Sequence, residues 1–217
     1  ITTVAADELG AWQYTFNSGE LAEGLNIIEV ISTNTVGIAA RSEPLNLILD
    51  TVAPIIFNYA PSGVYDQTTD TIELYVSGDD LDEIAVTDTS GYSLYGSGGD
   101  GSFTDGNEWL IPISGVSIDM ISGLVQINTA VMLTDDYYQL HIDPNVTVRD
   151  LAGNAAYLIT PPAGEEIVIA FEVDTEGPSA PLAPFLDADS DTGASNSDTI
   201  THENLSLIHI SEPTRPY

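Results

Sequence analysis

Short apolar runs separated by turn residues form the pattern of this chain. The runs are rich in Val, Ile, Tyr and Thr, which favour the pleated, half-buried surface of a sheet. No stretch keeps a helical period over three turns. The pattern predicts an all-β chain, and the strand spacing favours a sandwich. The predicted strands are 26–31, 45–49, 72–76, 110–113, 124–127, 137–142 and 167–173.

Aromatic residues near the start of the chain follow a two-residue period. Trp12, Tyr14 and Phe16 alternate with Gln13 and Thr15. Because alternate residues of a strand share one face, this pattern predicts a strand that carries three aromatic side chains on one side. Such rings can stack on sugars, but opposite polar neighbours they are more typical of a core.

A repeat organises the chain. Residues 49–54 read LDTVAP and residues 173–178 read VDTEGP, so each copy ends a strand with Asp-Thr and then places a proline. Residues 31–40 and 147–156 precede these copies, and each puts a strand before a turn that contains glycine. Two copies at this separation predict a tandem array. We expect the end of one module at 1–50, a complete module at 51–174 and the opening of a third at 175–204.

Composition narrows the range of partners. The 217 residues carry three Lys plus Arg, none of them Lys, against 34 Asp plus Glu, for a net charge of −31. Such a field repels nucleic acid and anionic membranes and attracts cations. Cysteine is absent, which excludes disulfides and thiolate metal sites. No apolar run is long enough to span a membrane.

The two ends of the chain indicate a fragment. The first residue is Ile1, with no signal-peptide pattern after it. Residues 205–217 read LSLIHISEPTRPY and resemble a translated sequencing adapter. We therefore leave this tail out of the fold prediction and expect the natural protein to continue beyond Asn204.

Several motifs together resemble the Ig-like repeats of large bacterial adhesins, biofilm-associated proteins and surface-layer proteins. Residues 10–16 (GAWQYTF) and 21–26 (LAEGLN) are similar to a strand and a turn of those repeats. Residues 150–154 (DLAGN) match their D-x-A-G-N turn, and 186–201 are similar to the opening of a further repeat. The resemblance implies tandem Ig-like Greek-key β-sandwich modules, one complete and two partial. It also implies a secreted or cell-surface location and a spacer role, with neighbouring modules as partners.

Calcium is the cofactor that this composition invites, because it binds carboxylate, carbonyl and amide oxygens in loose geometry. In the proteins that the chain resembles, calcium rigidifies module junctions. Residues 187–191 carry Asp at alternate positions and partly resemble an EF-hand loop, but Thr192 stands where the turn glycine belongs. The alternative is a set of solvated turn carboxylates. The candidate ligands are Asp50, Asp150, Asn154, Asp174, Asp187, Asp189, Asp191 and Asp198, with the 150–154 turn expected at the same end of the module as Asp174.

Catalytic chemistry finds little support. The carboxylate pairs 79–80, 82–83 and 135–136 lie in hydrophilic turns, where neighbouring acids are usually solvated. His141 alternates with apolar residues on a predicted strand, as an outward-facing histidine does. We predict that the chain is not an enzyme.

The glycine-rich region 91–109, which ends at Trp109, is long for a hairpin connection. It is either a decorated connection or an exposed loop that binds a glycan or a host surface protein. The predicted function is therefore a spacer of a calcium-dependent adhesin. The alternatives are a ligand-binding adhesin module that uses residues 91–109 and an accessory module of a secreted enzyme.

Overall fold

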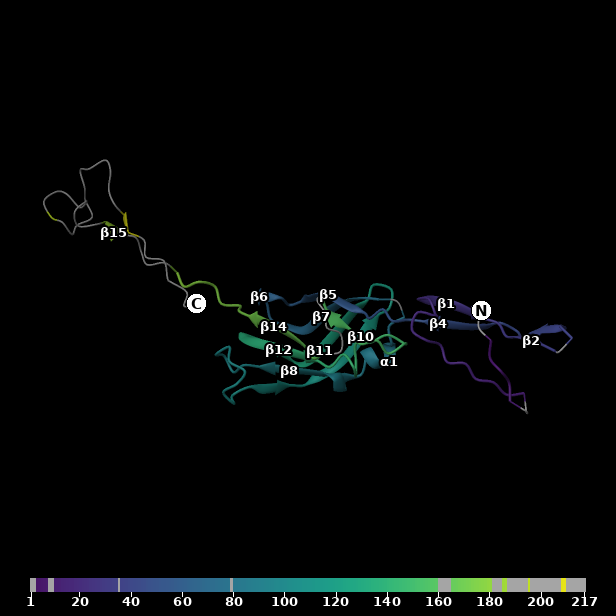
Figure 1. Ribbon diagram of the computed structural model, residues 1–217. Helices are drawn as coiled ribbons and strands as arrows, with labels where there is room; N and C mark the ends of the chain where they lie inside the picture. Colours follow the sequence, from purple (N-terminus) through teal and green to yellow (C-terminus); the bar gives the residue numbers. More distant parts are fainter. Residues whose placement is uncertain are drawn as a thin grey trace. The chain divides into compact units, whose positions relative to one another are not determined.

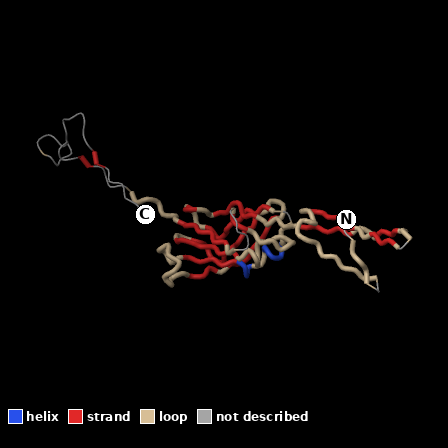
Figure 2. The backbone as a smooth tube through the Cα atoms, in the orientation of Figure 1, coloured by secondary structure: helices blue, strands red, loops and turns tan. Residues whose placement is uncertain are grey.

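The computed structural model describes residues 3–7, 10–34, 36–78, 80–159, 165–180 and 195, together with the backbone of 185–186 and 208–209. Its contacts divide the chain into two compact units, 1–173 and 174–217. Strands dominate the described part of the first unit, and the described helices are single turns (Figure 2). The predicted all-β fold class is confirmed.

A β-sandwich forms the larger part of the first unit. Its first sheet has the order β10-β11-β7-β5-β13, and its second has the order β6-β14-β12-β8-β9 (Figure 1). Neighbouring strands are antiparallel except for β13 on β5 and β6 on β14. The first sheet consists of β5 (Ile55–Ala60), β7 (Thr69–Ser77), β10 (Ile113–Asp119), β11 (Leu124–Leu133) and β13 (Tyr157–Leu158). The second consists of β6 (Gly63–Tyr65), β8 (Tyr92–Gly96), β9 (Trp109–Ile111), β12 (Asp136–Ile142) and β14 (Ile167–Val173).

Alternation along the strands builds the core between the two sheets. In β7, β12 and β14 every second side chain is buried, as a sheet with one covered face requires. Tyr138 of β12 stacks on Phe171 of β14 with ring centroids 5.3 Å apart. The Tyr138 hydroxyl donates to the carbonyl of Thr134, so the buried ring keeps a partner for its polar end.

The chain enters and leaves the sandwich at opposite ends. We call the end with Ile55, Ser77 and Ile142 the entry end, because β5 begins there. Ile167 pairs with Ile142 at the entry end, and Val173 pairs with Asp136 six residues further along both strands. Only two residues connect the end of β11, in the first sheet, to the start of β12, in the second. The end of the first sheet at Leu133 therefore lies beside the end of the second sheet at Asp136 and Val173. We call this the exit end.

Short helical turns close the entry end. Helix α1 (Glu83–Val86) begins after Asp82, whose carboxylate accepts from the amide of Ala85 at 3.1 Å and caps the helix. The 3₁₀ turn η1 (Thr89–Gly91) leads into β8. Thr147 bonds the carbonyl of Ala85 at 2.9 Å and ties α1 to the segment that follows β12.

Residues before the sandwich form two small sheets. Strand β1 (Gly24–Ile28) pairs with β4 (Leu45–Leu49), and β2 (Ile31–Thr33) pairs with β3 (Ala39–Arg41). No second layer among the described residues covers β1 and β4: Ile27 is 65% and Ile48 69% exposed.

The prediction for the first aromatic run is wrong. Residues 11–17 form no strand, and Trp12 is 51% exposed. Tyr14 and Phe16 meet edge to face at 5.1 Å, but no facing sheet among the described residues packs on them. A two-residue period becomes a buried strand only where a partner strand and a second layer are present.

The second unit is described only in part. β15 (Phe185–Leu186) pairs antiparallel with β16 (Ile208–His209), so the described pairing includes residues of the tail that resembles an adapter. The predicted module boundaries and the adapter origin of the tail stay predictions.

Candidate functional site

The 150–154 turn is a compact hydrogen-bonded unit at the entry end. Asp150 is 1% exposed, and both of its carboxylate oxygens accept hydrogen bonds from Asn154. The backbone amide of Asn154 donates to Oδ1 and its side-chain amide donates to Oδ2, each at 2.8 Å. Gly153 takes a φ of +92°, which closes the turn without strain. The sequence motif therefore builds a buried carboxylate with charge-assisted partners.

Asn154 also joins this turn to the chain that enters the sandwich. Its side-chain nitrogen donates to the backbone carbonyl of Asp50 at 3.2 Å. The Asp50 carboxylate is used locally, because it accepts from the amide of Val52 at 3.0 Å. Two of the predicted residues thus meet through a backbone oxygen.

The entering chain makes a second contact, with the segment that precedes the sandwich. The Glu23 carboxylate accepts from the amide of Thr51 at 2.9 Å and from its hydroxyl at 2.7 Å. Residues 50–51 are therefore bonded both to the preceding segment and to the sandwich. We call Glu23, Asp50, Thr51, Asp150 and Asn154 the entry clamp. Sequence analysis missed Glu23 and Thr51, although the Asp-Thr repeat marked the place.

The expected position of the turn needs a correction. We expected 150–154 to lie at the same end as Asp174, but Asn154 bonds Asp50 at the entry end. Strand β14 leads from Ile167, paired with Ile142, to Val173 at the exit end. Seven residues of extended strand separate the two positions by about 20 Å. The turn comes late in the sequence, but the last strand crosses the whole sandwich after it.

The remaining predicted ligands do not lie together in the described part of the structure. The Asp174 carboxylate accepts from the amide of Glu176 at 3.1 Å, as in an Asx-turn. Asp187, Asp189, Asp191 and Asp198 lie outside the described residues. Within the described part, no three Asp, Glu or His side chains form a group that fits a metal ion. With both oxygens of Asp150 bonded to Asn154, the turn has the geometry of a hydrogen-bonded lock, and calcium at the junctions stays a prediction.

A second carboxylate hub, Asp136, lies at the exit end, and sequence analysis considered this residue only as half of the 135–136 carboxylate pair. Asp136 accepts from the Ser97 hydroxyl at 2.7 Å, from the Gly99 amide at 2.8 Å and from the Trp109 indole at 3.3 Å. Burial acts to raise the pKa of Asp136, but these bonds and that from the Tyr137 amide hold it below its ordinary value. This carboxylate therefore ties the glycine-rich loop to β12.

The 97–109 loop is ordered by short-range bonds. Asp100 accepts from the Ser102 amide at 2.9 Å and from the side chain of Asn107 at 3.1 Å. The Ser102 amide is the main cause that lowers the pKa of Asp100. Gly96 has to be glycine, since a Cβ there would collide with the Trp109 indole. The loop is thus a built connection around Asp136.

Aromatic residues of the 91–109 region divide between core and surface. Tyr92 is 5% exposed and donates to the carbonyl of Val86, and burial raises its pKa to about 12. Trp109 is 42% exposed at the edge of the second sheet. Tyr95 points outward from β8 and packs edge-on against His141 at 5.5 Å. Exposed aromatic surface therefore lies on the sheet beside the loop.

Residues considered for catalysis have structural partners. Asp82 caps α1 and lies 3.5 Å from the guanidinium of Arg149. Asp136 orders the glycine-rich loop. His141 lies 3.2 Å from the carboxylate of Glu166, on the outer face of β12. These three residues thus have structural partners, and the absence of catalysis stays a prediction.

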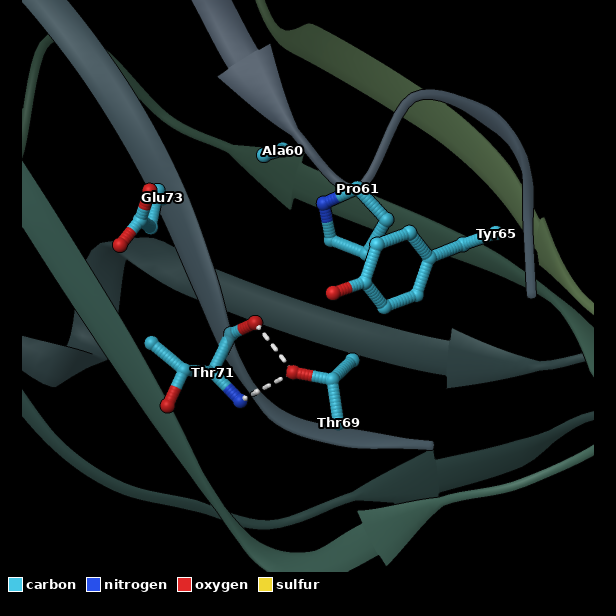
Figure 3. A pocket seen from close by; sticks show the side chains of 6 residues that line it. All are labelled: Ala60, Pro61, Tyr65, Thr69, Thr71 and Glu73. Carbon is cyan, nitrogen blue, oxygen red and sulfur yellow. Dashed lines mark hydrogen bonds between the residues drawn. The ribbon is translucent and has the colours of Figure 1, made fainter. Parts of the chain in front are cut away.

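A shallow hollow of about 180 Å³ lies at the exit end of the first sheet (Figure 3). Thr69 turns its hydroxyl to the backbone of Thr71, bonding the amide at 3.1 Å and the carbonyl at 2.9 Å. Glu73 accepts from Tyr75 and Gln126. The hollow is smaller than typical small-molecule pockets of about 300–1,000 Å³. Thr69 and Glu73 therefore bond neighbouring groups of the sheet and do not converge on a ligand.

Comparisons with known proteins show limited likeness. No family model matches the chain, and no curated protein is significantly similar to it. Similar solved structures include the N-terminal part of the bacterial S-layer protein SbsC, with a TM-score of 0.38 and 11% identity. That match covers 60% of this chain and 26% of SbsC. Another is PcoC, a methionine-rich copper resistance protein from Escherichia coli, with a TM-score of 0.37, 16% identity, and 56% and 98% coverage.

The described helices include none that is long and apolar enough to cross a membrane.

Proposed function

We propose that the chain is a non-catalytic spacer module of a large extracellular bacterial adhesin, which transmits tension from one module to the next. The observation that carries the proposal is the path of the chain: it enters at Ile55 and leaves at Val173, at opposite ends of one sandwich. Modules joined in this way extend end to end.

The terminal strands of the sandwich suit a load applied along the chain. Tension at the exit end pulls β14 along its own axis, between β12 and β6. Its hydrogen bonds to β12, from Val173↔Asp136 to Ile167↔Ile142, are then loaded together and not one after another. Many bonds that share a load resist it better than bonds that open singly.

The entry clamp supports the same role. Glu23 and Asn154 bond adjacent residues of the connection from opposite sides. A connection held at two adjacent residues has fewer accessible conformations than a free linker. A spacer benefits from such stiffness because it keeps the distal part of the protein away from the cell.

Single-molecule stretching of the full chain tests the proposal. With handles at both ends, we expect the sandwich to unfold in one cooperative step that lengthens the chain by about 400 Å, at about 3.4 Å per extended residue. A gradual extension without a discrete step would contradict a load-bearing module.

Calcium at the junctions is the finer part of the proposal. The net charge of −31 favours bound cations, and extracellular calcium is in the millimolar range that weak sites need. We expect millimolar calcium to raise the thermal midpoint by several degrees over excess chelator, with no such rise in magnesium. Coincident curves would remove calcium from the proposal and leave the spacer role intact.

A further inference from the structure

The outer face of the second sheet carries aromatic and uncharged polar side chains in register. Gln139 lies on the middle strand β12, opposite Tyr95 of β8 and Ala170 of β14. Tyr95 in turn lies opposite Leu110 of β9. The alternating neighbours Tyr138, Leu140 and Ile142 are buried, so the odd-numbered residues of β12 face outward. We call this face the platform: Tyr95, Leu110, Tyr137, Gln139, His141 and Val168.

The two platform tyrosines are held in place. Tyr95 packs its ring edge-on against His141, with an interplanar angle of 85°. Gly101 of the glycine-rich loop lies against the ring of Tyr137, where an added Cβ would come within 3.3 Å. Tyr137 is the diagonal neighbour of Tyr95 across the strand pair, at about 7–8 Å. The rings therefore form a pair of fixed apolar surfaces at neighbouring positions.

Polar groups on the platform remain available to a ligand. Within the described chain, the side-chain amide of Gln139 and the hydroxyl of Tyr95 have no hydrogen-bond partner. The outer face of the first sheet differs, because there Glu73 accepts from Tyr75 at 2.9 Å and from Gln126 at 3.1 Å. Both sheets thus present aromatic residues, but on the first sheet Glu73 already binds the Tyr75 hydroxyl and the Gln126 amide beside them.

Charge limits the kind of ligand. The chain has 34 acidic residues, and two of its carboxylates adjoin platform residues: Glu172 lies opposite Tyr137, and Glu166 contacts His141. A polyanion would be repelled by the chain as a whole, and a polycation would find stronger sites elsewhere. A neutral ligand suits this face.

We propose that the platform binds a neutral polysaccharide. A pyranose ring has an apolar face of C–H groups, which stacks on an aromatic ring, and a rim of hydroxyls. Tyr95 and Tyr137 supply the stacking surfaces, and the Gln139 amide supplies a donor and an acceptor for the hydroxyls. This goes beyond the spacer role, because it makes the module itself adhesive. The site lies on the sheet, and the glycine-rich loop supports it from one side.

Native affinity electrophoresis of the full chain tests the platform, with dextran, galactomannan and xyloglucan as neutral probes and alginate as the anionic one. We expect at least one neutral polysaccharide to retard the chain and alginate to leave it unchanged. Tyr95→Ala and Tyr137→Ala each weaken the retardation at least tenfold, and Gln139→Ala weakens it about fivefold.

Matched variants on the other sheet keep the test specific. Phe57→Ala and Tyr75→Ala remove a comparable aromatic pair, whose centroids lie 6.2 Å apart, and leave retardation unchanged. Thermal unfolding verifies that each variant is folded. If Tyr95→Ala fails to fold, the variants of the exposed Tyr137 and of Gln139 carry the test.

Three results would overturn the proposal: no retardation by any neutral probe, retardation by alginate alone, or equal weakening by the variants of both sheets. Sedimentation of the unliganded chain tests whether a second copy of the chain binds the platform instead. Self-association that Tyr137→Ala abolishes would make the platform an interface between copies and would also overturn the proposal. The stretching experiment is independent of all these outcomes.

Discussion

Two turns of this chain share a hydrogen-bond pattern and have opposite surroundings. In the 34–38 turn, Asn34 bonds the carbonyl of Ile38 at 3.0 Å, and the Ile38 amide returns a bond to the Asn34 side chain at 2.9 Å. In the 150–154 turn, Asp150 and Asn154 make the same two bonds at 3.2 and 2.8 Å. Strand pairs flank both turns at matching positions, Thr33↔Ala39 and Arg149↔Ala155.

The difference lies in what each turn touches. Asn34 is exposed, whereas Asp150 is 1% exposed and its partner Asn154 reaches Asp50. Ile38, which stands where Asn154 does, is 69% exposed and has no side-chain hydrogen-bonding group. The comparison teaches that a local motif determines how a turn folds. Whether the turn also bonds the entering chain depends on one side chain, Asn or Ile, and on a second layer that buries the turn's carboxylate.

The largest expected effect on stability distinguishes the sandwich from the small sheets that precede it. Leu140→Ala leaves a cavity in the core, where Leu140 is fully buried, and we expect it to lower the free energy of unfolding by about 2–5 kcal/mol. Ile27→Ala removes a side chain that is 65% exposed and changes this energy by less than about 0.5 kcal/mol. Urea unfolding followed by circular dichroism measures both. Equal losses would show that Ile27 is covered in solution.

The second prediction compares the turns directly. Asp150→Ala removes the buried carboxylate that accepts from Asn154 and leaves the backbone amide of the half-buried Asn154 unpaired, so we expect a loss of about 1–3 kcal/mol. Asn34→Ala acts on the exposed turn, where water replaces the lost bonds, and costs about 0.5 kcal/mol. Urea unfolding of the two variants gives the comparison, and a reversed order would contradict the burial argument.

The third prediction concerns Asp136 at the exit end. Its native pKa is lowered, so its stabilisation is complete above the ordinary value near about 4 and is lost as the pH falls through the native pKa. We expect Asp136→Asn to cost about 1–3 kcal/mol at pH 7, because the amide no longer accepts all the bonds. The difference from the wild type shrinks on acidification. If the difference in the free energy of unfolding grew at low pH, the pKa of Asp136 would be raised in the native state and not lowered.

The smallest effect belongs to the exposed half of the entry clamp. Glu23→Gln weakens surface bonds to Thr51 and changes the free energy of unfolding by less than about 0.5 kcal/mol. The amide of Thr51 should nevertheless exchange faster with deuterium, since its acceptor is weaker. Glu29→Gln, which alters a surface pair with Arg41, is the matched control and leaves Thr51 exchange unchanged.

Part of the fold followed from the sequence because strand signals are local. The predicted runs 45–49 and 167–173 coincide with β4 and β14, and 72–76 lies within β7. Among the strands of the sandwich, sequence analysis missed β5, β6, β8 and β13, and all of β10 except its first residue. Pro61 follows β5 closely, and Gly91 and Gly96 bound β8, so turn residues obscured the strand pattern there.

The sequence by itself determined the all-β class, the two similar turns and the Asp-Thr entry to the sandwich, because each depends on neighbouring residues. The tertiary structure alone decided which turn has a buried carboxylate, which end Asn154 occupies and which face leaves Tyr95 and Gln139 accessible. It also gave Asp136 its role, by bringing Ser97, Gly99 and Trp109 to one carboxylate. These features depend on the pairing of distant strands and on the second sheet, and the spacing of residues along the chain does not encode either.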